Sequence, residues 1–105
     1  MTNFVVVYTG GTMPESEEDI AAVMGAWGAW YEGMGAAIVD GGNPFGASKS
    51  IGGDGAVNDG PVSSPPATGY TIISADSLDA AMAKVKNHPH LNYGGQISVY
   101  ETFEM

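Results

Sequence analysis

A strand pattern followed by a helix pattern occurs twice along this chain of 105 residues, and this order constrains the fold more than any other feature. The first strand is Phe4–Tyr8, a run of β-branched and aromatic residues that is closed by two glycines. Because the run is apolar at consecutive positions, we expect both of its faces to be buried. Thr12 or Ser16 then caps an amphipathic helix that ends at Gly33 or Gly35. Its apolar stripe, at steps of three and four, is Ile20, Val23, Met24, Trp27, Tyr31 and Met34.

The same order returns in the second half of the chain. Gly69–Ser74 predicts a strand, and Asp76 or Ser77 caps the helix that follows it. The apolar stripe of this helix is Leu78, Ala81, Met82 and Val85. The helix must end before Pro89, because the residue ahead of a proline avoids the helical region. Gln96–Phe103 predicts the last strand.

The two halves are joined by the strand Ala36–Asp40 and a segment rich in Gly, Ser, Pro and Asp, for which we predict a β-hairpin arm of Ser48–Ile51 against Ala56–Asn58. The chain is therefore predicted to be one α+β domain spanning residues 1–105. Its fold is a ferredoxin-like βαββαβ sandwich with an inserted β-hairpin arm and both helices on one face of the sheet. Because the other face is left bare, we expect a homodimer with the two sheets packed face to face.

Charge and composition exclude several classes of partner. Twelve acidic residues against three lysines give a formal net charge of -9, which repels nucleic-acid phosphates and anionic lipid surfaces. The chain contains no cysteine, which removes disulfides, thiolate catalysis and cysteine-ligated zinc. The start of the chain lacks the features of a secretory signal, and no segment approaches a membrane span of ~20 residues. We expect a cytoplasmic protein, and because no glycine pair matches a phosphate-loop motif, we predict no cofactor.

Four short motifs follow one another along the chain: DGPV at 59–62, GYTIISADSLDAA at 69–81, HPHL at 88–91 and GGQISVY at 94–100. In this order and spacing the chain resembles the YCII-related family, including its DGPF branch, over nearly its whole length. Val62 replaces the phenylalanine of the DGPF signature. The resemblance implies a ferredoxin-like, dimeric α/β barrel with a pocket beside the sheet.

The resemblance also bears on activity. For some YCII-like members it implies acid/base chemistry by a His–Asp pair, with the histidine in the first helix. Met24 stands at that position here, and the predicted first helix contains no histidine. The family's acid/base pair is therefore not carried over to this chain, and whether the protein is an enzyme stays open.

The stretch NHPHLNYGG contains both histidines of the chain. Pro89 extends the backbone between them, so that His88 and His90 can project to one side and share a metal such as zinc or nickel. No spacing in the chain supplies the further ligands that a stable site needs, and we predict no metal. In the structural alternative, His88 caps the negative end of the second helix while His90 or Leu91 packs at the entry to the last strand. A pocket histidine that acts as an acid or base is the remaining alternative.

Five other residues are candidates for a ligand site. Asp59 is either a pocket carboxylate or a cap of its own turn, and Asp40 has the same ambiguity. Lys49 either holds an anionic ligand or protects a hairpin edge from strand pairing. Trp30, at the edge of the first stripe, and Tyr70 are candidate pocket walls.

Three hypotheses of function follow. The leading one is a YCII-related homodimer that binds a small organic molecule in a pocket between the sheet, the first helix and the hairpin arm. The second is a cofactor-free lyase or isomerase with His90 or His88 as base and Asp59 or Lys49 assisting. The third is a structural or regulatory dimer without a ligand, in which packed side chains would fill the pocket.

Overall fold

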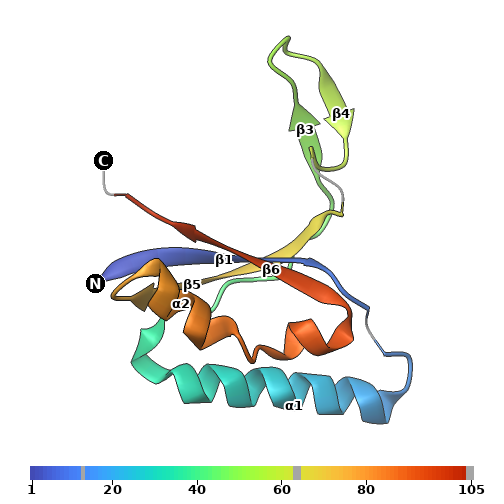
Figure 1. Cartoon of the computed structure of the whole chain (residues 1–105). Coiled ribbons are helices and arrows are strands. Elements are labelled where there is room, and N and C mark those ends of the chain that lie inside the picture. Colours follow the sequence, from blue (N-terminus) through green and yellow to red (C-terminus); the bar gives the residue numbers. More distant parts are fainter. Residues whose placement is uncertain (13, 63–64, 104–105) are drawn as a thin grey trace.

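The computed structural model describes residues 1–12, 14–62 and 65–103, and it has an α+β fold. The elements in chain order are β1 (Thr2–Gly10), α1 (Glu17–Met34), η1 (Gly35–Ala37), β2 (Ile38–Asp40), β3 (Lys49–Ile51), β4 (Val57–Asp59), β5 (Ala67–Ala75), α2 (Leu78–Val85), η2 (Pro89–Tyr93) and β6 (Gly95–Glu101). The main sheet is antiparallel with the strand order β2-β5-β1-β6, and α1 and α2 lie on one of its faces (Figure 1). This is the ferredoxin-like arrangement, so the predicted fold class is confirmed.

Capping groups determine where the helices begin and end. The hydroxyl of Ser16 accepts a hydrogen bond from the backbone N–H of Asp19 at 3.1 Å, and Ser77 caps α2 in the same way. Of each pair of predicted N-caps, the serine is therefore the one used. Gly35 ends α1 with a φ of 52°, which a residue with a side chain rarely adopts. In the described part of the chain, no helix is long and apolar enough to cross a membrane.

The hydrophobic core lies between the helices and the sheet. Alternate residues of β1 and β5 point into it and are buried, namely Phe4, Val6, Tyr8, Thr71, Ile73 and Ala75. Ala81 and Val85 of α2 pack against them. Leu78 and Met82, which the predicted stripe of this helix included, are instead exposed. The short α2 presents only one narrow line of side chains to the sheet, and these two residues lie beside that line.

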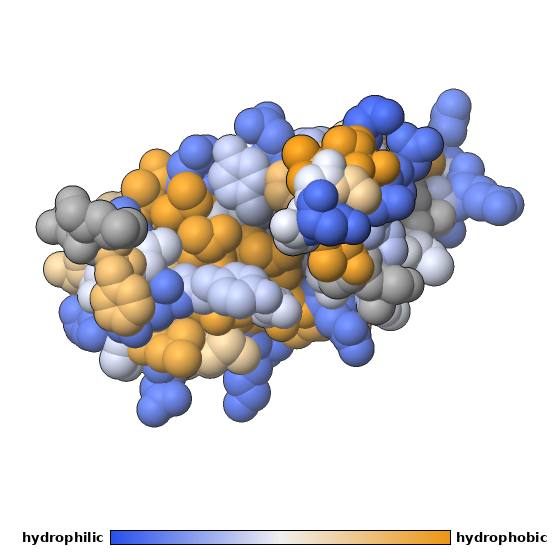
Figure 2. Space-filling view, turned by 90° about the horizontal axis from the view of Figure 1, so that it is seen from above, coloured by the Kyte–Doolittle hydropathy of each residue, from blue (hydrophilic) through white to orange (hydrophobic). Residues whose placement is uncertain are grey.

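The intervening residues of the central strands lie on the opposite face of the sheet. Val5 and Val7 are only half-buried, and their cross-strand neighbours on this face are Ile72 and Tyr70. Figure 2 looks onto this face and shows hydrophobic side chains gathered across its middle, beside the hairpin arm. The expected burial of both faces of the first strand is therefore not reached within the described single chain.

The predicted hairpin arm forms, but β3 begins at Lys49 and not at Ser48, and β4 spans Val57–Asp59 and not Ala56–Asn58. Lys49 of β3 lies opposite Asp59 of β4, and Ile51 lies opposite Val57. The arm rises from the sheet on the side away from the helices (Figure 1). Its direction takes it away from the face that α1 covers.

The strands β1 and β5 are longer at both ends than predicted, and β2 and β6 are each shortened at one end. Ala36 and Ala37 belong to the turn η1, because the chain is still leaving α1 through Gly35, whose backbone N–H bonds to the carbonyl of Tyr31. β6 ends at Glu101, and Phe103 beyond it is 82% exposed. The ladder stops there because β1, its partner, has reached its own first residues.

Candidate functional site

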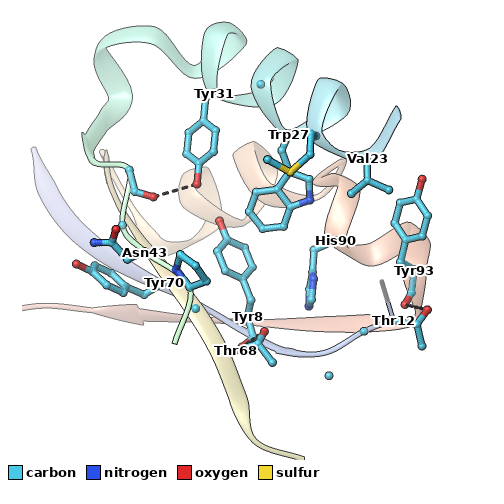
Figure 3. Close-up of a pocket in the computed structure, with 18 residues that line it drawn as sticks. Tyr8, Thr12, Val23, Trp27, Tyr31, Asn43, Thr68, Tyr70, His90 and Tyr93 are labelled. Carbon is cyan, nitrogen blue, oxygen red and sulfur yellow. Dashed lines mark hydrogen bonds between the residues drawn. The ribbon is translucent and has the colours of Figure 1, made fainter. Parts of the chain in front are cut away.

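A cavity of about 620 Å³ lies between α1 and the ends of the central strands (Figure 3). One wall is the α1 surface around Trp27, and the opposite wall consists of the end of β1 and the start of β5. Segment 41–44, after β2, closes one side, and η2 closes the other. No Asp, Glu, Lys or Arg is among the described residues that line it.

Several aromatic rings line the cavity and pack against one another. Tyr8 and Trp27 meet edge to face with ring centroids 5.0 Å apart, and Tyr31 lies beside Trp27 at 6.3 Å. The ring of His90 stands edge-on to Tyr8 at 5.4 Å. These rings come from α1, β1 and η2, so the tertiary fold is what brings them to one cavity.

A network of hydroxyl groups lies at the end of the cavity near β2. The Tyr8 hydroxyl is 2.8 Å from Thr71 Oγ1, and the Tyr31 hydroxyl is 3.1 Å from the same atom. Tyr31 also donates to the carbonyl of Gly41 at 2.9 Å, and Thr71 donates to that carbonyl at 3.2 Å. Burial raises the pKa of Tyr8 further above its ordinary value, so this residue stays a neutral phenol.

His90 is held at the other end, where η2 meets β1. Its Nε2 lies 2.9 Å from the carbonyl oxygen of Thr9. Two glycines leave room for the ring: a Cβ at Gly11 would lie 2.8 Å from His90 Cε1, and one at Gly95 would collide with Nε2. The glycine pairs near positions 10 and 95 therefore serve to seat an imidazole as well as to turn the chain.

His88 is almost completely buried beside the cavity, with 1% of its surface exposed. Its Nδ1 accepts a hydrogen bond from the backbone N–H of His90 at 3.0 Å, which makes it the N-cap of η2. Its ring packs between Trp27 and Trp30, each with a centroid distance of 4.4 Å. The prediction that His88 caps the negative end of the second helix is therefore wrong: it caps the start of the following turn.

The buried position of His88 determines its protonation. Burial, and secondarily the nearby His90, lowers the pKa of His88 to about 4. The ring is therefore neutral at pH 7, and since Nδ1 accepts a hydrogen bond, Nε2 carries the hydrogen. Nε2 finds no hydrogen-bond partner among the residues that the structure describes. A ring in this state positions its neighbour and is shielded from any ligand.

The structure brings only part of the predicted ligand site together. His90 and Tyr70 line the cavity. Trp30, proposed as a pocket wall, lies outside the described lining, because its indole N–H turns away to donate to the carbonyl of Lys84 at 3.2 Å. Asp40 also lies outside it, and its carboxylate instead accepts a hydrogen bond from Gly42 N at 2.8 Å.

Lys49 and Asp59 lie on the hairpin arm, where they form an exposed ion pair of 2.8 Å with each other. Because the arm projects away from the helices, Asp59 is not brought to either histidine (Figure 1). The hairpin arm was expected to form one wall of the pocket. This expectation is wrong, because the described residues of the arm do not line the cavity. Within the described parts of the chain, no three His, Asp or Glu residues cluster as metal ligands do.

Sequence reasoning missed several residues that shape the site. In the sequence, Tyr8 and Thr71 are part of ordinary strand patterns. Only the pairing of their strands places their hydroxyl groups together. Gly11, Gly41 and Gly95 were visible in glycine pairs, a signal of close approach between segments. The sequence does not say which segment approaches each pair.

The strand order and the one-sided helices define a ferredoxin-like α+β protein with a cavity beneath its first helix. A solved structure with a similar fold is that of 5-chloro-2-hydroxyhydroquinone dehydrochlorinase from Burkholderia phenoliruptrix AC1100, in complex with 2,5-dihydroxybenzoquinone. The likeness covers 97% of this chain and 95% of that chain, with a TM-score of 0.57 and 20% sequence identity. At this identity it concerns the fold alone, and it agrees with the YCII-like fold implied by the sequence motifs. No family model matches the chain, and no curated protein matches its sequence.

Proposed function

We propose that this YCII-like protein binds a small, uncharged ring compound in the cavity beneath α1. The cavity carries the proposal: its volume of about 620 Å³ is in the range of small-molecule sites, and aromatic rings form its walls. A filled interior, as expected for a purely structural dimer, would leave no such space. The absence of formal charge from the described lining favours an uncharged ligand, because an ion would lose its hydration there without gaining a partner.

The structural neighbour gives independent support for a small ring compound as the ligand. It is an enzyme of similar fold whose structure holds 2,5-dihydroxybenzoquinone, a small ring compound. The likeness extends over nearly the full length of each chain, so the comparison concerns whole domains and not one shared motif. The sequences are too different for the neighbour's reaction to be assigned to this chain.

The binding proposal is tested by filling the cavity. Gly28 on α1 lines it, and a Cβ there meets no described atom within 4 Å, so Gly28→Leu places a side chain in open space within the cavity. Gly25, on the same helix, is equally open but lies outside the described lining, and Gly25→Leu is the matched control. Each substitution improves helix propensity by up to about 1 kcal/mol, so neither is expected to unfold the protein.

The assay is a thermal shift against a panel of small, neutral aromatic compounds, followed by calorimetry on any that bind. A compound at 100 times its dissociation constant should stabilise the wild type by about 2.7 kcal/mol. The Gly25→Leu variant should respond in the same way, and Gly28→Leu should not respond. Equal responses of the two variants would place the ligand elsewhere, and a panel without any binder would count against the function itself.

We further propose that the protein is a homodimer whose two main sheets pack face to face. The support is the open sheet face, where Val5, Val7 and Ile72 are only half-buried and Tyr100 is 59% exposed (Figure 2). A stable interface of about 800 Å² per partner would remove such a surface from water. A second copy is the candidate partner because it presents the same apolar face.

The dimer is tested by sedimentation or light scattering of the wild type and of Ile72→Lys, which places a charge in the middle of this face. Ala83→Lys, at an exposed position of α2, is the control with the same added charge. The wild type and the control should have the mass of two chains, and Ile72→Lys the mass of one. A monomeric wild type at micromolar concentration would refute the proposal.

A further inference from the structure

We propose that the ligand of this cavity carries a hydroxyl group bound directly to an unsaturated ring, as a phenol or enol does, and that His90 accepts its proton at Nδ1. The proposal rests on the function proposed above and adds a ligand class and a role for one residue. It follows from which atoms of the cavity are already used in hydrogen bonds.

The tautomer of His90 follows from its single backbone partner. The carbonyl oxygen of Thr9 only accepts hydrogen bonds, so the Nε2 atom 2.9 Å from it must carry a hydrogen. In the neutral ring, Nδ1 then carries no hydrogen and has a free lone pair. It forms no hydrogen bond with the described residues. Among the described residues, one buried side-chain polar atom lacks a hydrogen-bond partner, and it is His88 Nε2. His90 Nδ1 also lacks a partner among them but does not belong to this buried group, so it is exposed. Nδ1 is therefore an accessible acceptor on a residue that lines the cavity.

Four hydroxyl groups of the lining, those of Tyr8, Thr12, Tyr31 and Thr68, are acceptors toward a ligand as well. Thr12 donates its hydrogen to the carbonyl of Tyr93, Thr68 donates to that of Tyr8, and Tyr31 donates to that of Gly41. Thr71 also donates to Gly41, so the contact between Tyr8 and Thr71 uses the hydrogen of Tyr8. Each of these hydroxyl groups already donates its one hydrogen to another group of the protein, so toward a ligand it can only accept a hydrogen bond.

The free Nδ1 of His90, with the four hydroxyl acceptors beside it in the lining, suits a ligand whose hydroxyl group donates a hydrogen bond. A carboxylate or phosphate would bring a full negative charge, and no lysine or arginine is among the described lining residues to balance it. The formal net charge of -9 adds to this discrimination at longer range. An uncharged ring with an ionisable hydroxyl enters without this cost.

Proton transfer inside the cavity then balances without a further reactant. The O–H bond of the ligand breaks, its electron pair stays on oxygen, and a new N–H bond forms at His90 Nδ1. The resulting imidazolium keeps its Nε2–H bond to Thr9 and pairs with the ligand oxyanion through Nδ1–H. The positive charge of the His90 ring therefore forms in the same step as the ligand oxyanion that it pairs with.

The site is built to hold this ring in place. Gly11 and Gly95 pack against its edges, and His88 accepts a hydrogen bond from the backbone N–H of His90. Met24, which stands where the YCII resemblance implies a histidine on the first helix, lines the same cavity from α1. The imidazole of this cavity therefore comes from η2 on the opposite side, a placement that the family pattern does not suggest.

Three probes of nearly equal size test the proposal: 4-nitrophenol, 4-nitroanisole, in which the hydroxyl is methylated, and 4-nitrobenzoate. They are titrated into the wild type at a pH one unit below the pKa of free 4-nitrophenol. We expect 4-nitrophenol to bind about tenfold or more tightly than either other probe. Binding should also increase its long-wavelength phenolate absorbance. In His90→Gln this increase should be lost, whereas Asn87→Gln, an exposed substitution in the same stretch, should retain it.

The outcomes separate this proposal from the broader one. Equal binding of the phenol and its methyl ether, or a phenolate signal that persists in His90→Gln, would overturn the role of His90 and leave an aromatic-binding cavity. Failure of all three probes to bind would count against both proposals. If His90→Gln does not fold, long-range proton–nitrogen NMR of the wild type decides: a hydrogen on Nδ1 in the free protein would refute the proposal, and its appearance there only with 4-nitrophenol would support it.

Discussion

Acid should destabilise this protein through His88, and the structure predicts the size of the effect. The ring is buried between two tryptophans, which lowers the pKa of His88 in the folded chain to about 4, from an ordinary value of about 6.5. At pH values between these two pKa values, His88 is protonated in the unfolded chain but not in the folded chain. The free energy of unfolding therefore rises with pH in this range. As the pH falls from 7 to 4.5, this single group should remove about 2 kcal/mol of stability, and about 3 kcal/mol by the time pH 4 is reached.

The measurement is urea unfolding of the wild type and of His88→Asn at several pH values between 4.5 and 7. Asparagine keeps an acceptor for the N–H of His90 and is a favourable N-cap, but it does not titrate. The smaller side chain lowers stability at every pH, so the comparison is between slopes and not between absolute values. The acidic residues and His90 are present in each protein, and their effects cancel in the difference.

A stability difference between wild type and His88→Asn that shrinks by about 2 kcal/mol from pH 7 to pH 4.5 is the expected result. A difference that stays constant would mean that His88 protonates as easily in the folded chain as in the unfolded one. That outcome would contradict its burial between the tryptophans. A difference that grows toward low pH would reverse the sign, and would require a charged partner for His88 that the described chain does not provide.

Two further substitutions test the geometry of the cavity. Gly95→Ala should cost about 1–3 kcal/mol in urea unfolding, because its Cβ collides with His90, whereas Gly53→Ala, with open space around it, should stay within about 0.5 kcal/mol of the wild type. Thr71→Val should cost about 1–3 kcal/mol in the same assay, since it leaves the buried Tyr8 hydroxyl without its partner; a cost below about 0.5 kcal/mol would mean that the hydroxyl network is satisfied in another way.

The order of strands and helices was predictable because each element has its own local pattern. The β-branched runs and the stripes at helical spacing depend on neighbouring residues only, and so do the capping serines at positions 16 and 77. The fold class followed, since few topologies connect such an order with both helices on one face. The errors fell at strand ends, as at Ala36 and Phe103, where pairing with a distant strand decides the boundary.

The candidate site was less predictable than the fold. The sequence drew attention to both histidines, but it could not say that His90 faces a cavity while His88 is sealed behind it. Asp59 and Lys49 looked like partners for chemistry until the hairpin carried them away from the helices and paired them with each other. Tyr8 and Thr71 looked like core residues, yet their hydroxyl groups meet beside the cavity.

The sequence by itself determined the fold class, the inserted arm and the short set of imidazoles that any chemistry here would use. The tertiary structure decided which of them has an accessible nitrogen, which aromatic rings form a wall and which glycines admit a neighbouring ring. The physical reason is the sequence separation over which the deciding contacts act. Helix and strand patterns arise from contacts a few residues apart, whereas the Nδ1 of His90 is made available by a bond to Thr9, at a sequence separation of 81 residues.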